Sequence, residues 1–329
     1  MARIVTVGAA QMGPIAKEET RNEVIDRLVA HLREGKRRGC DLVVFPELTL
    51  TTFFPRWFYE DQADIDRWFE SEMPGPETKR LFDEAKALGL AFKLGYAELI
   101  EEEGRTRHFN TAILVDKSGA ITGKYRKIHL PGHAEHEPWR QFQHLEKRYF
   151  EPGNLGFRVF DALGGRFGMC ICNDRRWPET YRVMGLQGVE MVLLGYNTPV
   201  HNPPAPEHDA FGWHHNTLVM QSGAYQNATW VVGVAKGGTE EGVPSIAGSQ
   251  IISPAGITVA ETLTERDELI SAACDLDECA SYKASVFAFE RHREPANYGL
   301  ITGTRGVVTP EEAERIEAEH RARWEADGA

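Results

Sequence analysis

The sequence predicts an α/β protein in which helices pack against a mixed β-sheet. Helix-like and strand-like segments alternate in the first half of the chain, whereas strand-like segments follow one another through short turns in the second half. Asp41–Phe45 is apolar after its first residue, which is typical of a strand buried on both faces. No low-complexity linker interrupts the series, so we expect one layered domain for most of the chain.

The first half of the chain begins with a strand, an amphipathic helix and a buried strand. A Met-Pro-Gly-Pro turn precedes a second helix, and Asp116-Lys-Ser-Gly119 is a hairpin-type turn between two later strands. The predicted strands are Ile4–Ala10, Asp41–Phe45, Ala91–Glu98, Phe109–Asp116 and Ile121–Lys127, and the predicted helices are Lys17–Arg38 and Pro74–Leu88.

The second half begins with a long irregular segment, Leu130–Phe150, which is rich in histidine and aromatic residues. An irregular segment of this length in a compact domain is usually functional. Helices are predicted near Pro178–Gln187 and over Asp209–Gln226, the second of them after the proline-rich loop Asn202–Glu207. The predicted strands are Arg166–Cys172, Met191–Tyr196, Trp230–Ala235, Ser249–Ser253, Thr258–Thr262 and Leu269–Asp275.

The C-terminal tail differs from the rest of the chain. Thr309-Pro-Glu-Glu312 fits a capping box with proline at the first helical position, and the charged stretch that follows to Trp324 predicts a short helix. Two interpretations stay open: a solvated appendage, or a helix that docks on a second subunit through a thin apolar stripe. We expect a domain over residues 1–302 and a helical extension over residues 303–329. The stripe consists of Ala313, Ile316 and Trp324.

Composition excludes several partners. The net charge of −12 argues against nucleic acid, and no apolar run reaches the roughly 18–20 residues that a membrane span needs. The N-terminus enters a strand at once, so no signal peptide is expected. The five cysteines are odd in number and scattered, which indicates reduced thiols and a cytoplasmic location.

Cys172 is the strongest candidate for a catalytic residue. It ends a predicted strand and precedes the polar turn Asn173–Glu179. A thiol at a strand tip lies beside free backbone N–H groups, which is how many folds present a nucleophile. The alternative is a small buried apolar residue without chemistry.

Two other polar residues also lie at strand ends. Glu47 follows the apolar run at residues 42–46, and Lys127 ends a later strand. With Cys172 they form a possible set for acyl transfer, in which Glu47 holds the thiol proton while Lys127 and the backbone N–H of Asn173 stabilise an oxyanion. Taken singly, Glu47 is equally explained as a helix-capping acid and Lys127 as part of a solvated basic strand.

Three motifs carry a family resemblance. Phe45-Pro-Glu47, Lys124-Tyr-Arg-Lys127 and Cys172-Asn-Asp-Arg175 resemble the motifs of the nitrilase (carbon–nitrogen hydrolase) superfamily, in the family's order. Within it, residues 3–302 look like the N-carbamoyl-D-amino acid amidohydrolases. That narrower likeness lies in Thr51–Trp57, His129–His133, Phe142–Tyr149, Asn173–Glu179 and Gly195–Pro199.

The resemblance implies a fold and a reaction. The fold is a four-layer αββα sandwich, with subunits paired in a homo-oligomer. The reaction is hydrolysis of an N-carbamoyl-D-amino acid to the D-amino acid, carbon dioxide and ammonia through a carbamoyl-enzyme thioester. A small-molecule substrate is implied, with no cofactor and no metal.

The resemblance also implies residue roles. Glu47 is the general base, Lys127 the oxyanion stabiliser and Cys172 the nucleophile, and Glu146 is a second acid that orients Lys127 or the substrate nitrogen. A guanidinium matches a carboxylate bidentately, which agrees with a substrate-carboxylate site at two consecutive arginines. The implied substrate-binding residues are Arg175, Arg176, His144, Asn173, Asn197 and Thr198, with His129 in support.

One loop departs from the pattern, and other functions compete. The loop Ala210–His214 leaves open whether His214 or His215 lines the pocket. Nitrile, simple amide and carbamoyl-polyamine hydrolysis use the same three residue types, although a polyamine needs acidic groups where Arg175 and Arg176 lie. A non-catalytic binding protein would be expected to have lost one member of the Glu–Lys–Cys set. A metallohydrolase is suggested only by two histidine groups without an HExxH pattern: His129, His133, His136 and His144, and His201, His208, His214 and His215.

Overall fold

The structure is a computed structural model that describes residues 2–140 and 142–326. Contacts between residues divide the chain into two compact units, Met1–Tyr282 and Lys283–Ala329. This division lies earlier in the chain than the expected boundary between residues 302 and 303.

The first unit contains two six-stranded mixed sheets. In the first sheet the order is β14-β1-β2-β3-β4-β5, with β1, β2 and β3 parallel and the remaining neighbours antiparallel. Parallel central strands need crossover connections, and α1 and α3 supply them. The bounds are β1 Ile4–Gln11, β2 Leu42–Val44, β3 Ala91–Glu102, β4 Arg105–Val115, β5 Ile121–Arg126 and β14 Glu268–Asp275.

The second sheet has the order β13-β12-β9-β8-β7-β6, and its central strands β7, β8 and β9 are parallel. A short hairpin of β10 and β11 lies outside both large sheets. The bounds are β6 Val159–Ala162, β7 Gly165–Ile171, β8 Met191–Tyr196, β9 Trp230–Ala235, β10 Thr239–Glu240, β11 Val243–Pro244, β12 Gln250–Ile252 and β13 Thr258–Glu261.

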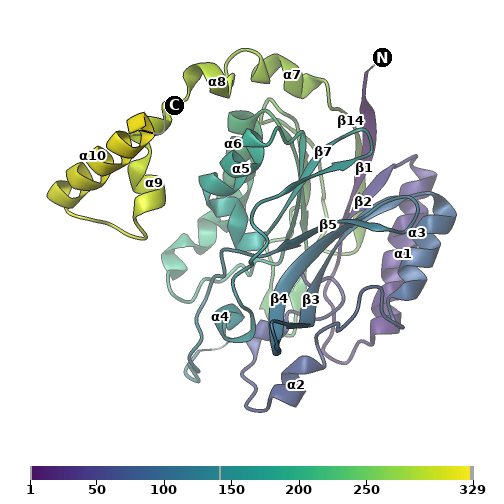
Figure 1. Cartoon of the computed structure of the whole chain (residues 1–329). Coiled ribbons are helices and arrows are strands. Elements are labelled where there is room, and N and C mark those ends of the chain that lie inside the picture. Colours follow the sequence, from purple (N-terminus) through teal and green to yellow (C-terminus); the bar gives the residue numbers. More distant parts are fainter. Residues whose placement is uncertain (1, 141, 327–329) are drawn as a thin grey trace. The chain divides into compact units, whose positions relative to one another are not determined.

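The two sheets pack face to face, and helices cover their outer faces. Along β2, Leu42 and Val44 belong to the apolar cluster shared with the second sheet, whereas Val43 belongs to the cluster formed with α1 and α3. On the second sheet, Met184 of α5 and Met220 of α6 lie against β7 and β9. Figure 1 shows α1 and α3 on one side of the sheets and α5 and α6 on the other. The predicted four-layer αββα sandwich is therefore confirmed.

The helices of this unit begin and end at identifiable signals. Helix α1 begins at Arg21 rather than Lys17, because Thr20 and Glu23 form a capping box there. Helix α3 ends at a left-handed glycine, Gly89. The bounds are α1 Arg21–Arg37, η1 Phe54–Arg56, α2 Gln62–Asp66, α3 Lys79–Leu88, α4 Glu146–Tyr149, η2 Cys172–Arg176, α5 Pro178–Leu186, η3 Pro206–Phe211, α6 Gly212–Asn227 and α7 Glu278–Lys283.

The second unit is a small helical cluster. The predicted capping box is confirmed, because Thr309 and Glu312 exchange backbone-to-side-chain hydrogen bonds at the start of α10. The carboxylate of Glu317 on α10 accepts the backbone N–H groups of Gly299 and Leu300, which holds α10 on α9. The bounds are α8 Phe289–His292, η4 Pro295–Asn297, α9 Gly299–Gly303 and α10 Pro310–Ala326. Across residues 2–140 and 142–326, no helix is long and apolar enough to cross a membrane.

Candidate active site

The candidate nucleophile lies on a strained turn one residue beyond its strand. Strand β7 ends at Ile171, and Cys172 begins the short 3₁₀ helix η2 with a left-handed φ of 47°. This conformation is unfavourable for any residue other than glycine and persists only where neighbouring contacts hold it. The Cys172 side chain is 3% exposed and lines a cavity of about 470 Å³. The structure thus presents the thiol to a cavity, as its place in the sequence predicts.

Asp174 holds this turn in place. Its fully buried carboxylate accepts the Ile171 N–H at 3.0 Å and the Tyr125 hydroxyl at 2.7 Å through one oxygen. The other oxygen accepts the His129 backbone N–H at 2.9 Å and lies 2.9 Å from His129 Nδ1. His129 therefore supports the turn and is not among the described residues that line the cavity. Sequence reasoning gave Asp174 no role, although an acidic residue two positions after a strand-tip cysteine was a usable signal.

The two consecutive arginines have different environments. Arg175 is 1% exposed and donates to the Cys172 carbonyl at 2.6 Å, to Asn216 at 2.8 Å and to Thr198 Oγ1 at 3.0 Å. Its Nη1 also lies 3.8 Å from Cys172 Sγ. Arg175 is thus engaged beside the nucleophile rather than placed on the cavity wall.

Arg176 lines the cavity, and its side chain is exposed. The charge of Arg175, together with partial removal from water, lowers the pKa of Arg176 to about 10. This value still leaves the guanidinium protonated at neutral pH. A cation therefore lies on the wall that Cys172 shares.

Three charged residues form a fully buried cluster next to the thiol. Glu47 follows β2, Lys127 follows β5 and Glu146 begins α4, and all three are 0% exposed. Lys127 Nζ donates to Glu47 Oε1 at 2.7 Å and to Glu146 Oε2 at 2.6 Å. Burial opposes the charged form of Lys127, but the carboxylates of Glu146 and Glu47 outweigh it and raise the pKa of the ammonium.

Each carboxylate of this cluster has further donors. His144 Nε2 lies 3.0 Å from Glu146 Oε1, and Lys127 and His144 together lower the pKa of Glu146 although burial alone would raise it. Glu47 accepts Asn110 Nδ2 at 2.7 Å and the Asn197 backbone N–H at 3.0 Å. The role of Asn110 was missed from the sequence, because Asn110 lies in the polar half of β4, where a buried polar residue does not stand out.

The surroundings of Cys172 favour the protonated thiol over the thiolate. Burial raises its pKa, the charge of Glu47 reinforces the shift, and Lys127 and Arg175 oppose it. Because the thiolate is the reactive form, a base must take this proton during reaction. The buried carboxylates supply the candidates.

The cavity wall also carries an unpaired donor and one of the disputed histidines. Asn197 is 1% exposed, and its side-chain Nδ2 has no hydrogen-bond partner among the described residues. Such a buried amide group is unfavourable unless a ligand accepts from it. His215 lines the cavity, whereas His214 is not among the described lining residues. The other predicted residues on the wall are His144, Asn173 and Thr198.

The histidine groups do not gather into a ligand set. Within the described ranges, no three His, Cys, Asp or Glu side chains are placed to hold a metal ion. Three of the histidines have other contacts. His201 Nδ1 lies 2.7 Å from Asp209, and His133 Nδ1 lies 3.5 Å from Glu137. The His136 ring stacks on the ring of Phe58.

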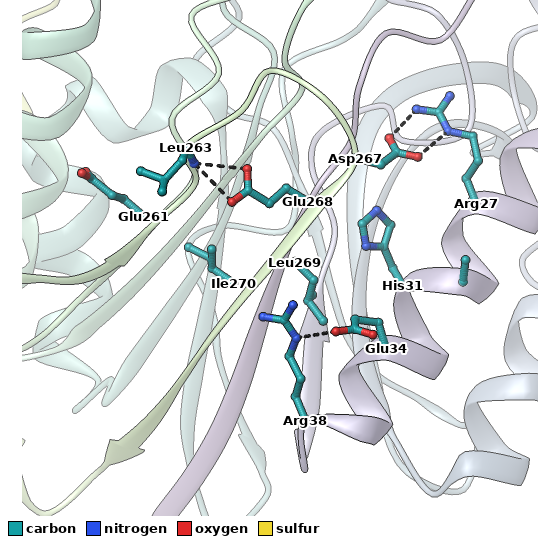
Figure 2. Close-up of a pocket in the computed structure, with 11 residues that line it drawn as sticks. Arg27, His31, Glu34, Arg38, Glu261, Leu263, Asp267, Glu268, Leu269 and Ile270 are labelled. Carbon is teal, nitrogen blue, oxygen red and sulfur yellow. Dashed lines mark hydrogen bonds and ion pairs between the residues drawn. The ribbon is translucent and has the colours of Figure 1, made fainter.

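A second cavity of about 570 Å³ lies between α1 and the β13–β14 connection (Figure 2). Its two lining arginines are each paired with a carboxylate: Arg27 with Asp267 at 2.6 Å, and Arg38 with Glu34 at 2.6 Å. Glu268 accepts the Leu263 backbone N–H. None of its described lining residues is a cysteine, serine or lysine that could act as a nucleophile.

Comparison with known proteins identifies the family of the chain. The family model for carbon-nitrogen hydrolases matches residues 6–284. An N-carbamoylputrescine amidase of Arabidopsis thaliana is 30% identical, over 91% of this chain and 95% of the relative. A citrullinase of Francisella tularensis is 28% identical, over 85% and 92%. A carbon-nitrogen hydrolase structure from Helicobacter pylori superposes with a TM-score of 0.77 at 21% identity, covering 92% of this chain and 99% of that one, and it supports the fold.

The chain therefore belongs to the carbon-nitrogen hydrolase family and is an enzyme that acts on amide-type carbon–nitrogen bonds. The names of these relatives differ from the narrower group that the sequence motifs resemble, so that group stays a prediction.

Proposed function

We propose that the protein hydrolyses N-carbamoyl-D-amino acids to the D-amino acid, carbon dioxide and ammonia. The observation that carries this proposal is Arg176, a charged guanidinium on the cavity wall that also carries Cys172. An N-carbamoyl amino acid has its carboxylate a few bonds from the attacked carbon, within reach of such a cation. The relative named for N-carbamoylputrescine supports the carbamoyl half of the proposal. The D configuration rests on the resemblance of the motifs.

The charges on the wall favour an anionic substrate over a polyamine. Two carboxylates lie among the described lining residues, and each has a positive or hydrogen-bonding partner: Glu137 pairs with Arg140, and Asp209 lies against His201. A polyamine would have to compete for these groups, whereas the one hydrogen bond of the Arg176 side chain within the described part of the chain is a weak contact with Asn173 Oδ1 at 3.4 Å. Complementary charge selects the substrate with the carboxylate.

The first half-reaction forms a thioester. Glu47 takes the proton of the Cys172 thiol, and the sulfur attacks the carbamoyl carbon. Lys127 has three N–H donors, of which two bind carboxylates, so the third and the Asn173 backbone N–H stabilise the oxyanion. As the tetrahedral intermediate collapses, Glu47 returns its proton to the amino acid nitrogen, which leaves a carbamoyl group on sulfur.

The second half-reaction releases the enzyme. Glu47 takes a proton from water, the hydroxide attacks the carbamoyl carbon, and the Cys172 sulfur leaves and regains the proton. The carbamic acid product decomposes to carbon dioxide and ammonia. Throughout, Glu146 holds the Lys127 ammonium toward the reacting carbon.

An ammonia-release assay tests the substrate class. It compares D and L forms of several N-carbamoyl amino acids with N-carbamoylputrescine, a nitrile and a simple amide. Faster turnover of the D forms is expected. Equal rates on the D and L forms would contradict a preference for D substrates. Faster turnover of N-carbamoylputrescine would contradict recognition of a substrate carboxylate.

Arg176→Leu tests the carboxylate contact itself. A charge-assisted contact contributes about 1.5–3 kcal/mol, so kcat/KM on N-carbamoyl amino acids should fall at least about tenfold. The loss should be much smaller on analogues in which a neutral amide replaces the carboxylate. Arg33→Leu, at an exposed arginine of α1, is the matched control. Equal losses on charged and neutral substrates would show that Arg176 supports the fold instead.

A further inference from the structure

A fully buried lysine lies behind the proposed base. Lys93, on β3, is 0% exposed and is not among the described residues that line the cavity. Its Nζ donates to the backbone carbonyls of Phe45 at 2.9 Å and Pro46 at 3.3 Å, the two residues that precede Glu47. The mechanism proposed above does not use it.

The backbone at Pro46 and Glu47 packs so closely against β3 and β8 that the facing residue of each strand, Gly95 and Gly195, has no room for a side chain. A methyl group on Gly195 of β8 would lie 2.4 Å from Lys93 Nζ and 2.6 Å from the Glu47 amide nitrogen. A methyl group on Gly95 would lie 2.4 Å from the Pro46 carbonyl oxygen and 2.9 Å from Glu47 Cα. Glycine at both positions lets β3 and β8 approach this turn, and the ammonium lies in the gap beside Gly195.

The groups that face Lys93 explain its charge. Carbonyl oxygens solvate the ammonium only in part, so burial lowers the pKa of Lys93 to about 7, and the charge of Glu47 opposes this shift. The facing thiol of Cys170 stays protonated, because burial raises its pKa well above the ordinary value. Lys93 is therefore a cation in acidic solution.

We propose that Lys93 is a positioning residue for Glu47, whose ammonium fixes the Phe45–Glu47 turn and stabilises the Glu47 carboxylate from the side away from the cavity. The consequence is a working range that extends to lower pH. This inference rests on the role of Glu47 as base in the proposed function. It does not depend on which amide substrate is hydrolysed.

The test compares Lys93→Met with Thr49→Val. Thr49 Oγ1 also donates to the Pro46 carbonyl, at 2.7 Å, and Thr49 is equally buried, so its variant removes a hydrogen bond from the same turn without removing a charge. The measurement is kcat/KM between pH 5 and 9 on whichever amide the wild type hydrolyses best. The acidic limb of Lys93→Met should move to higher pH by at least about half a unit, whereas that of Thr49→Val should stay in place.

Lys93→Gln keeps the test decisive if Lys93→Met folds poorly. Glutamine retains a donor for the carbonyls without the charge, so its acidic limb should shift while its melting temperature stays near that of the wild type. An unmoved limb in a folded Lys93 variant would overturn the proposal and leave Lys93 a hydrogen-bonding residue only.

A substrate-free readout separates this inference from the proposed function. The rate at which iodoacetamide alkylates Cys172, followed by peptide mass, needs a carboxylate to accept the thiol proton and needs no substrate. Its acidic limb should shift in Lys93→Met in the same direction. A shift of the acidic limb without turnover of N-carbamoyl amino acids would contradict the proposed substrate and support the proposed role of Lys93. Turnover of N-carbamoyl amino acids without a shift would support the substrate and contradict the role of Lys93.

Discussion

Two cavities of the first unit, of about 570 and 470 Å³, differ more in how their charges are paired than in size. The larger, shown in Figure 2, lies between α1 and the β13–β14 connection, and each of its two lining arginines is paired with a carboxylate, Arg27 with Asp267 and Arg38 with Glu34. The smaller contains a buried thiol on a strained turn, an Asn197 amide nitrogen without a partner among the described residues, and the exposed guanidinium of Arg176. A polar group without a hydrogen-bond or ion-pair partner in the protein can bind a substrate. Such groups therefore identify the active site better than cavity volume does.

Cys172→Ala should produce the largest effect. Members of a catalytic set act as a unit, so turnover should fall about ten-thousandfold or more, while the melting temperature stays close to that of the wild type. Cys170→Ala is the control, because that thiol is packed in β7 two residues earlier and should lower stability rather than turnover. Substantial activity in a pure Cys172→Ala preparation would place the chemistry elsewhere.

Asp174→Asn tests whether the buried Asp174 carboxylate supports the turn that carries Cys172. Asparagine keeps one acceptor oxygen and replaces the other with an NH2 donor. This donor faces either the Tyr125 hydroxyl and the Ile171 N–H or the His129 N–H, so the left-handed turn at Cys172 loses part of its support. The free energy of unfolding, measured with urea, should fall by about 2–4 kcal/mol. The value of kcat should fall with it, because the thiol is misplaced. A variant with wild-type kcat would show that the left-handed conformation at Cys172 does not depend on the Asp174 carboxylate.

Arg175→Lys tests the second support of the nucleophile. Lysine cannot donate from one fork to the Cys172 carbonyl, Asn216 and Thr198 together. We expect kcat to fall about tenfold or more on charged and neutral substrates alike, in contrast to Arg176→Leu. Loss confined to substrates with a carboxylate would instead make Arg175 a substrate contact.

Asp267→Asn in the other cavity should have the smallest effect. Burial alone would raise the pKa of Asp267, but Arg27 and the Gly13 backbone N–H lower it. A lowered folded-state pKa stabilises the protein above the unfolded value, near pH 4, and the contribution is lost as the pH falls through the folded value. The pair is partly exposed, so the variant should lose about 0.5–1 kcal/mol at pH 7.

The pH dependence of that loss is the measurement. Urea unfolding of Asp267→Asn and the wild type should give free energies that converge as the pH falls below about 4. The value of kcat/KM should be unchanged at every pH. An activity loss here would contradict the assignment of chemistry to the smaller cavity alone.

Much of the fold could be predicted from the sequence because its signals are local. The strand Met191–Tyr196 was predicted with its observed bounds, and the cap at Thr309 begins α10 as expected. Helix α1 was predicted too long, because the charged residues before Arg21 suit a helix as well as a loop. Strand β6 and the β10–β11 hairpin were missed, because short strands carry little periodicity.

The sequence by itself determined which residue types stand at strand ends: Glu47, Lys127 and Cys172 follow their strands, and strand ends in a layered sandwich converge. Tertiary structure alone decided what each neighbour does. Arg175 and Arg176 are adjacent and identical in type, yet one lies beneath the thiol and the other on the cavity wall. Asn110 and Lys93 contact the Glu47 segment from distant parts of the chain, and Asp174 ties the Cys172 turn to the distant Tyr125 and His129. Burial and charge at such a place are set by segments that meet only on folding, so no local pattern records them.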